Sequence, residues 1–185
     1  MANQTEDLKV IQVTESVLLK EIEFSDASDI FIAIDSQREY LGKWLPFVDK
    51  TKEIADSHNF IKSVSDTPSE NREYTFVIHY NGVFAGVIGF KSTDKLNKRT
   101  EIGYWLSEPF QKLGIITASV KKLMQFAYDD LGMNRIQIKC AVGNIPSRNI
   151  PRKLGYTFEG IERAGELLSG DVFTDIAVYS KLKND

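Results

Sequence analysis

The sequence has few of the residues from which metal centres and disulfide frameworks are built. Among its 185 residues there is one cysteine, Cys140, and there are two histidines, His58 and His79, which lie far apart. A single cysteine cannot form an intrachain disulfide, and these three residues show no metal-ligand spacing. We therefore expect neither a disulfide nor a metal cofactor.

Long apolar runs and a strong charge of one sign are also missing. No stretch approaches the roughly 20 apolar residues of a membrane-spanning helix, and residues 1–7 lack the basic start and apolar stretch of a secretory signal. The net charge is −3, whereas nucleic-acid binders usually carry a basic excess. We expect a cytoplasmic protein that binds neither membranes nor nucleic acid. The length and the hydrophobic content of 42% are those of one folded domain, residues 1–185.

The first half of the chain mixes helices with the start of a sheet. Residues 17–22 predict a strand, after which Ser25 or Asp26 could cap a helix. Residues 41–47 predict an apolar loop or short helix, and residues 52–65 predict another helix. Asn81-Gly82 is a strong hairpin signal. It separates strands at 74–80 and 83–90, and a third strand at 100–106 completes an antiparallel meander.

The second half alternates helices with strands. A long amphipathic helix follows Gly114 and stops before Gly132 and Asn134. A strand at 135–140, a short helix at 145–154 and two strands at 157–163 and 173–182 complete the chain. The order predicts a mixed α/β (α+β) domain. Pro151 removes a hydrogen bond within the short helix, so that helix either starts late or kinks there.

A turn that suits phosphate precedes the long helix. It consists of Gln111, Lys112, Leu113, Gly114, Ile115, Ile116 and Thr117. The first N–H groups of a helix have no intrahelical partner, and the helix dipole adds positive potential there. Gly114 allows the backbone to approach a ligand closely. The turn matches neither the nucleotide P-loop nor the dinucleotide fingerprint, and a plain connecting loop is the alternative.

Three blocks of this sequence resemble the GNAT family of acetyl-CoA-dependent N-acetyltransferases. The family pattern Gln/Arg-x-x-Gly-x-Gly/Ala is matched by Gln111 and Gly114, with Ile116 in place of the last small residue. Residues 144–160 resemble its Asn-x-x-Ser…Lys-Leu-Gly-Phe…Glu-Gly segment, and residues 101–106 resemble the strand before the turn. Residues 41–45 and 175–180 resemble the branch that contains the ribosomal-protein serine/alanine acetyltransferases.

The resemblance implies a GNAT-like fold, in which helices flank a mostly antiparallel mixed sheet with a splayed central strand pair. The pantetheine arm of acetyl-CoA would enter the splay and bond the backbone of Trp105, Leu106 and Ser107. The pyrophosphate would bind the turn at residues 111–117, where the bulky Ile116 must point away from it. A homodimer or higher homo-oligomer is common in the family.

The resemblance also places the catalytic residues. Glu101 is the first candidate for the base, with an ion pair to Lys98 or Arg99 as its alternative; Glu166 is the second, with a solvated loop carboxylate as its alternative. Many members carry a tyrosine acid where this chain has Pro151, so Ser147 is the candidate to bond the CoA sulfur. Asn144 would bond the pantetheine amide or cap its helix.

The expected reaction is direct transfer of acetyl from acetyl-CoA to a primary amine. By resemblance, the acceptor is a protein N-terminus, with a polyamine or aminoglycoside as the alternative. Trp44, Phe47, Glu166 and Phe173 form an aromatic and acidic mixture that would suit a cationic amine. A CoA-binding regulatory domain without turnover is the alternative from another class. Cys140 is expected to be a buried packing residue and not an acetylated nucleophile.

Overall fold

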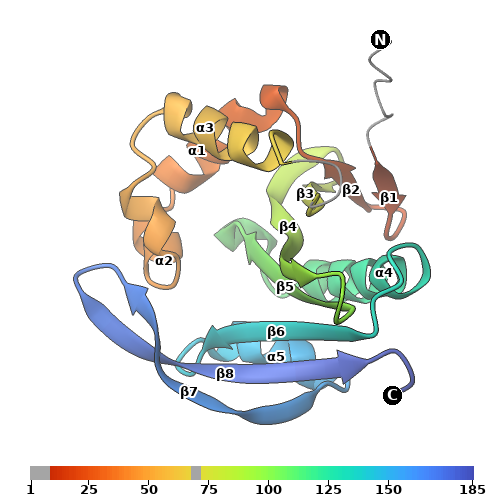
Figure 1. Ribbon diagram of the computed structural model, residues 1–185. Helices are drawn as coiled ribbons and strands as arrows, with labels where there is room; N and C mark the ends of the chain where they lie inside the picture. The colour runs from red at the N-terminus through yellow and green to blue at the C-terminus, as the bar shows by residue number, and fades with distance from the viewer. Residues whose placement is uncertain (1–8, 68–71) are drawn as a thin grey trace.

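The computed structural model describes residues 9–67 and 72–185 of the chain. The polar residues 1–7, in which we saw no secretory signal, lie outside the described residues. The described residues form an eight-stranded sheet with helices on both sides (Figure 1). Within the described residues, no helix is both long and apolar enough to cross a membrane.

The strand order is β1-β2-β3-β4-β5-β6-β8-β7. All neighbours are antiparallel except β5 and β6, which are parallel. The fold is therefore the mixed, mostly antiparallel one that the sequence predicts. The strands are β1 Val10–Gln12, β2 Val17–Glu21, β3 Thr75–Tyr80, β4 Val83–Asp94, β5 Arg99–Leu106, β6 Arg135–Ala141, β7 Thr157–Leu168 and β8 Val172–Leu182.

Five α-helices and three 3-10 turns complete the described residues. The helices are α1 Ala27–Asp35, α2 Arg38–Gly42, α3 Ile54–Ser65, α4 Ile115–Asp129 and α5 Ile145–Lys153, and the turns are η1 Phe24–Asp26, η2 Pro46–Asp49 and η4 Glu108–Phe110. In Figure 1, α1, α2 and α3 gather on one side of the sheet, while α4 and α5 lie on the other. The prediction that Ser25 or Asp26 caps α1 is wrong for the side chains, because the Asp26 carboxylate accepts from the Glu23 N–H in a capping box (2.8 Å).

Two hydrophobic clusters cover the two faces of the sheet. Successive strand residues point to opposite faces, so Phe76 and Ile78 join the cluster beneath α4, whereas Val77 joins the one beneath α1 and α3. The α4 side chains Val120, Leu123 and Ala127 are fully buried in the first cluster. Each helix layer is thus fixed to the sheet from its own side.

Two turns match their sequence signals. Asn81 and Gly82 both have positive φ (50° and 79°), as a type I′ hairpin turn requires, and β3 and β4 pair around them. Gly114 takes φ +77° immediately before α4. These two turns set the direction in which the meander and the long helix leave the sheet.

Candidate active site

The turn before α4 presents unpaired backbone donors. Lys112 and Gly114 have positive φ (63° and 77°), whereas Leu113 between them does not. Such an alternation of right-handed and left-handed backbone conformations makes a concave nest of N–H groups that binds anions. Among the described residues, none accepts a hydrogen bond from the backbone N–H groups of 112–117, and the first helical bond is that of Ala118 to Gly114 (3.0 Å). The side chains of Ile115 and Ile116 are buried in the core, away from these N–H groups. The arrangement suits a pyrophosphate.

The side chain of Gln111 points to the N-terminal helices. Its amide donates to the hydroxyl of Tyr40 on α2, and the Gln37 side-chain oxygen accepts the Glu108 N–H (2.7 Å). Gln111 therefore ties the turn to α2 in this structure. The side chain of Leu113 is more than half exposed.

The parallel strands β5 and β6 separate soon after they meet. They pair only at residues 99–101 and 135–137, although β5 continues to Leu106 and β6 to Ala141. The Ser107 N–H donates to Ala85 O on the β4 side (2.8 Å). Because backbone groups alternate between the two sides of a strand, those of Trp105 also face β4 and those of Leu106 face the side that β6 has left. Of the three predicted backbone contacts, Leu106 is the one that the splay leaves open.

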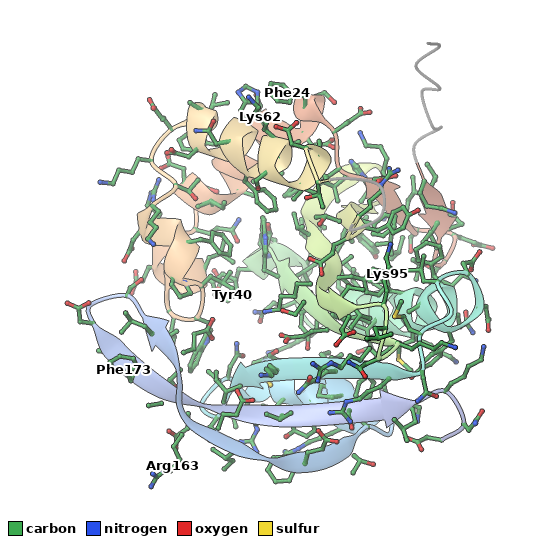
Figure 2. The ribbon with its side chains drawn as sticks, in the orientation of Figure 1. Phe24, Tyr40, Lys62, Lys95, Arg163 and Phe173 are labelled. Atoms are coloured by element: carbon green, nitrogen blue, oxygen red, sulfur yellow. The ribbon has the colours of Figure 1, made fainter. Side chains whose placement is uncertain are left out.

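A cavity of about 460 Å³ opens at this splay. That volume lies in the usual range of small-molecule sites, about 300–1,000 Å³. Its lining includes four aromatic side chains, which we call the aromatic wall: Trp44, Phe47, Phe60 and Trp105. It also includes Cys140, Asn144, Ser147 and Glu166. Phe173 does not belong to the described lining: it is largely exposed and lies on the β7–β8 hairpin (Figure 2).

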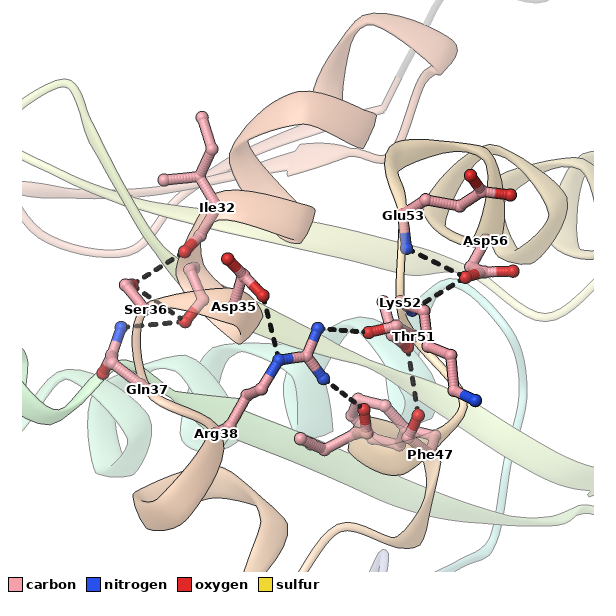
Figure 3. A network of polar contacts seen from close by, with 12 residues as sticks. Ile32, Asp35, Ser36, Gln37, Arg38, Phe47, Thr51, Lys52, Glu53 and Asp56 are labelled. Atoms are coloured by element: carbon pink, nitrogen blue, oxygen red, sulfur yellow. Dashed lines mark hydrogen bonds and ion pairs between the residues drawn. The ribbon is translucent and has the colours of Figure 1, made fainter.

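Arg38 holds the aromatic wall in place (Figure 3). Its guanidinium donates to the backbone oxygens of Val48 (2.9 Å) and Thr51 (2.6 Å), and to Asp35 (2.9 Å). The Thr51 hydroxyl in turn donates to Phe47 O (3.0 Å). This network joins the start of α2 to η2, the turn that carries Phe47. No pattern in the sequence indicated this role of Arg38, because its partners lie 10 and 13 residues further along the chain.

The two candidate bases lie near one lysine. Glu101 is buried and pairs with Lys91, the residue opposite it on β4 (2.9 Å), so the expected partners Lys98 and Arg99 are wrong. Glu166 lies on β7 and not in a loop, and it lines the cavity, whereas Glu101 is absent from the described lining. Glu166 is exposed overall, so it keeps the solvated character of the alternative reading. Partial burial at the cavity still raises its pKa, with a smaller contribution from the Glu101 charge, while Lys91 opposes the rise.

Asn144 and Ser147 meet at the start of α5. The Asn144 side-chain oxygen accepts the Ser147 N–H (3.2 Å), so the predicted cap is present. The Ser147 hydroxyl donates to the hydroxyl of Tyr104 on β5 (3.2 Å), which donates to the Ser147 backbone oxygen (3.1 Å). No local sequence signal indicated Tyr104. The helix runs from Ile145 through Pro151 to Lys153, so the alternative of a late start is wrong.

Cys140 is buried and free, as expected, but it also lines the cavity. Burial raises the pKa of its thiol, and the neighbouring Ser147 and two arginines counter that rise. A raised thiol pKa lowers the thiolate fraction that a nucleophile needs. Among the described residues, no cluster of three or more histidine, cysteine or acidic side chains could hold a metal ion.

Comparison with known proteins finds relatives over nearly the whole chain. The family model described as "Acetyltransferase (GNAT) domain" matches residues 16–157. The putative ribosomal N-acetyltransferase YdaF of Bacillus subtilis is 33% identical, covering 94% of this chain and 95% of its own. The microcin C7 self-immunity acetyltransferase MccE, solved with acetyl-CoA and AMP, has a TM-score of 0.87 at 31% identity (93% and 95% covered). RimL, a ribosomal L7/L12 α-N-protein acetyltransferase solved with coenzyme A, has a TM-score of 0.89 at 25% identity (94% and 98% covered).

Proposed function

This chain belongs to the GNAT family and is an N-acetyltransferase with acetyl-CoA as its donor, and we propose that its acceptor is the N-terminal amine of a protein. The observation that carries the proposal is the cavity at the splay, which combines an aromatic wall with the carboxylate of Glu166. An ammonium group is attracted both to a carboxylate and to the faces of aromatic rings. The names of the relatives YdaF and RimL, both ribosomal acetyltransferases, support the same acceptor class.

We propose that the donor lies along the turn and the splay. The N–H groups of 112–117 bind the pyrophosphate with the help of the α4 dipole, and Lys112 adds positive charge. The backbone of Leu106 bonds the pantetheine arm as a neighbouring strand would, and the free amide N–H groups of Asn144 bond it from the α5 side. The thioester then reaches the part of the cavity near Ser147.

Glu166 is the better candidate for the base. A free α-amine is mostly charged near pH 7, so it must lose one proton before its nitrogen has the lone pair that bonds the acetyl carbon. Glu166 lines the cavity and its pKa is raised, and a carboxylate of raised pKa takes a proton more readily. Glu101 is instead engaged in an ion pair with Lys91 (2.9 Å), and its remaining negative charge contributes to the raised pKa of Glu166.

Ser147 stabilises the leaving group. As the carbon–sulfur bond breaks, the Ser147 hydroxyl donates a hydrogen bond to the thiolate sulfur. A thiol has a pKa near 8.5, so the thiolate can take its proton afterwards from water. The charged amine gives up two protons in becoming an amide. The first leaves through Glu166 to solvent before the nitrogen attacks. The second leaves once the carbon–nitrogen bond has formed, and it balances the proton that the thiolate takes up through water.

One acceptor screen tests the proposal. Peptides that begin with serine or alanine, the same peptides with a blocked N-terminus, spermidine and an aminoglycoside are each incubated with protein and acetyl-CoA, and free thiol is measured. We expect turnover with the free peptides and none with the blocked ones, which controls for internal lysines. Turnover with spermidine or the aminoglycoside alone would contradict the proposal and favour the small-amine alternative, which the acidic and aromatic cavity also suits.

The oligomeric state and the cytoplasmic location stay predictions. A homodimer would appear as about 42 kDa in light scattering, twice the chain mass of 21.0 kDa. Of the two edge strands of the described sheet, β1 has three residues, whereas β7 has twelve and is exposed along most of its length.

A further inference from the structure

Tyr104 is a polar residue of the cavity that the proposed chemistry leaves without a task. It lines the cavity from β5, and its hydroxyl bonds α5 at a single residue, Ser147. It makes two hydrogen bonds there, one to the backbone and one to the side chain. A tyrosine that holds both ends of one residue fixes the position of that residue.

The reason for this arrangement lies four residues further along α5. In an α-helix the carbonyl of residue i accepts the N–H of residue i+4. For Ser147 that residue is Pro151, which has no N–H. The Ser147 carbonyl therefore lacks its helical donor, and a buried unpaired carbonyl is costly. The Tyr104 hydroxyl supplies the missing hydrogen bond (3.1 Å).

The direction of the second bond follows from the first. A phenolic hydroxyl has one hydrogen, and the Tyr104 hydrogen is used on the Ser147 carbonyl. The Tyr104 oxygen can then only accept, so the Ser147 hydroxyl must be the donor across the 3.2 Å contact. Burial raises the pKa of Tyr104 above its usual value, so the hydroxyl stays protonated in any ordinary assay. The Ser147 oxygen is thereby held at one place on the cavity wall. Its single hydrogen can turn from the Tyr104 oxygen to the sulfur as the thiolate forms, while the Tyr104 hydrogen bond to the Ser147 carbonyl keeps the residue in position.

We propose that Tyr104 is a positioning residue for Ser147, and that Pro151 makes this possible by freeing the Ser147 carbonyl. The inference rests on the proposed function, in which Ser147 bonds the leaving sulfur. Pro151 stands where many family members carry a tyrosine, and here a tyrosine from a neighbouring strand approaches the same helix turn. From the sequence alone Pro151 was expected only to shorten or kink the helix. In the structure its missing N–H leaves the Ser147 carbonyl free to accept from Tyr104.

Kinetics test the coupling of the two side chains. We expect Tyr104→Phe to lower kcat about tenfold while changing the KM for acetyl-CoA less than about twofold, since only the position of Ser147 is lost. Ser147→Ala should lower kcat by at least as much, and the double variant should be no slower than Ser147→Ala alone. Tyr128→Phe is the matched control: its hydroxyl also donates to a backbone carbonyl, Lys181 O (3.0 Å), outside the cavity, and kcat should not change.

The outcomes separate this inference from the function on which it rests. Loss of turnover in Ser147→Ala with full kcat in Tyr104→Phe overturns the inference alone. Losses that multiply in the double variant also overturn it, because Tyr104 would then act independently of Ser147. Full kcat in Ser147→Ala overturns the role of Ser147 and the inference together.

Thermal unfolding tests the part of Pro151 without any acceptor. Tyr104→Phe leaves the Ser147 carbonyl unpaired and should lower the Tm. Pro151→Ala restores an N–H at the right place in the helix, so in that background Tyr104→Phe should lower the Tm clearly less. Equal Tm losses in the two backgrounds would show that Tyr104 and Pro151 are not coupled and would overturn the proposal. Tyr128→Phe should lower the Tm equally in both backgrounds.

Discussion

Replacing Arg38 by alanine should loosen the aromatic wall of the cavity. The guanidinium makes hydrogen bonds to Val48 O and Thr51 O (2.9 and 2.6 Å), and Thr51 O has no other donor among the described residues. Hydrogen bonds to a charged group contribute about 1.5–3 kcal/mol each. The Val48 oxygen keeps its backbone donors in η2, and the Arg38 side chain is 37% exposed, so we take the lower end of that range for both bonds.

The expected loss is therefore about 3 kcal/mol of unfolding free energy for the two bonds together. The Asp35 ion pair adds little to it, because both partners are exposed. For a chain of this size about 1 kcal/mol corresponds to a Tm change of roughly 2–4 °C, so the Tm should fall by about 6–12 °C. Arg38→Lys should recover only part of the loss, since an ammonium lacks the planar fork that reaches two carbonyls.

Two measurements check this reasoning. Thermal unfolding compares Arg38→Ala with Arg163→Ala, a change on the exposed face of β7 (Figure 2) that should shift the Tm by less than about 2 °C. Steady-state kinetics should show a raised KM for the amine acceptor and an unchanged KM for acetyl-CoA, because Arg38 supports η2 and not the pyrophosphate turn. Equal Tm values for the two variants, or a changed KM for acetyl-CoA alone, would refute the reasoning.

Further predictions concern the donor turn and the acid–base groups. Acetyl-CoA at 100 times its Kd should stabilise the protein by about 2.7 kcal/mol, seen as a raised Tm; no shift at saturation would contradict donor binding. Gly114→Ala, at φ +77° with no atom within 4 Å of the new Cβ, should cost about 1 kcal/mol in stability and weaken acetyl-CoA binding measured by calorimetry. Glu166 must be ionised to act as a base and its pKa is raised. On lowering the pH, log kcat/KM should therefore fall more steeply once Glu166 takes up its proton, at a pH above the pKa of an ordinary glutamate. Glu166→Gln should be slower and should show only the shallower fall that protonation of the amine causes. Cys140→Ala should keep most of its kcat, and complete loss would indicate a covalent route.

Local signals in the sequence account for most of the fold. The Asn81-Gly82 hairpin, the three-stranded meander and the helix after Gly114 are confirmed within a few residues. The strand β1 was missed because three residues are too few to show a periodic pattern of apolar side chains. It is recognised as a strand only from its pairing with β2. The strand β7 was ended at Arg163, whereas it continues to Leu168 past a bulge where Ala164 has φ +50°. The Asp175 carboxylate, from the next strand, accepts the Ala164 N–H (2.8 Å), and no local pattern could reveal that.

The site was predictable where its residues follow one another and unpredictable where strands bring them together. The turn and the Asn144–Ser147 helix start each form a continuous segment with a recognisable pattern. The pairing of Glu101 with Lys91 depends on the register between β4 and β5, which shifts between Lys91 and Asp94, so counting outward from the turn between these strands would have missed it. The contact of Tyr104 with Ser147 spans 43 residues and depends on how far β5 and β6 diverge.

The separation of β5 from β6 gives this sheet an edge in its interior. Outer edges must be protected, because any extended polypeptide can pair with them. An interior edge can be reached only through the gap between the two strands, so only a ligand narrow enough to enter that gap can pair with it. The strands stay paired at residues 99–101 and 135–137, so a ligand inserted between β5 and β6 must stop where this pairing begins. A narrow, extended ligand with its reactive group at one end meets that condition. The closed end of the splay then determines how far the reactive group enters the sheet.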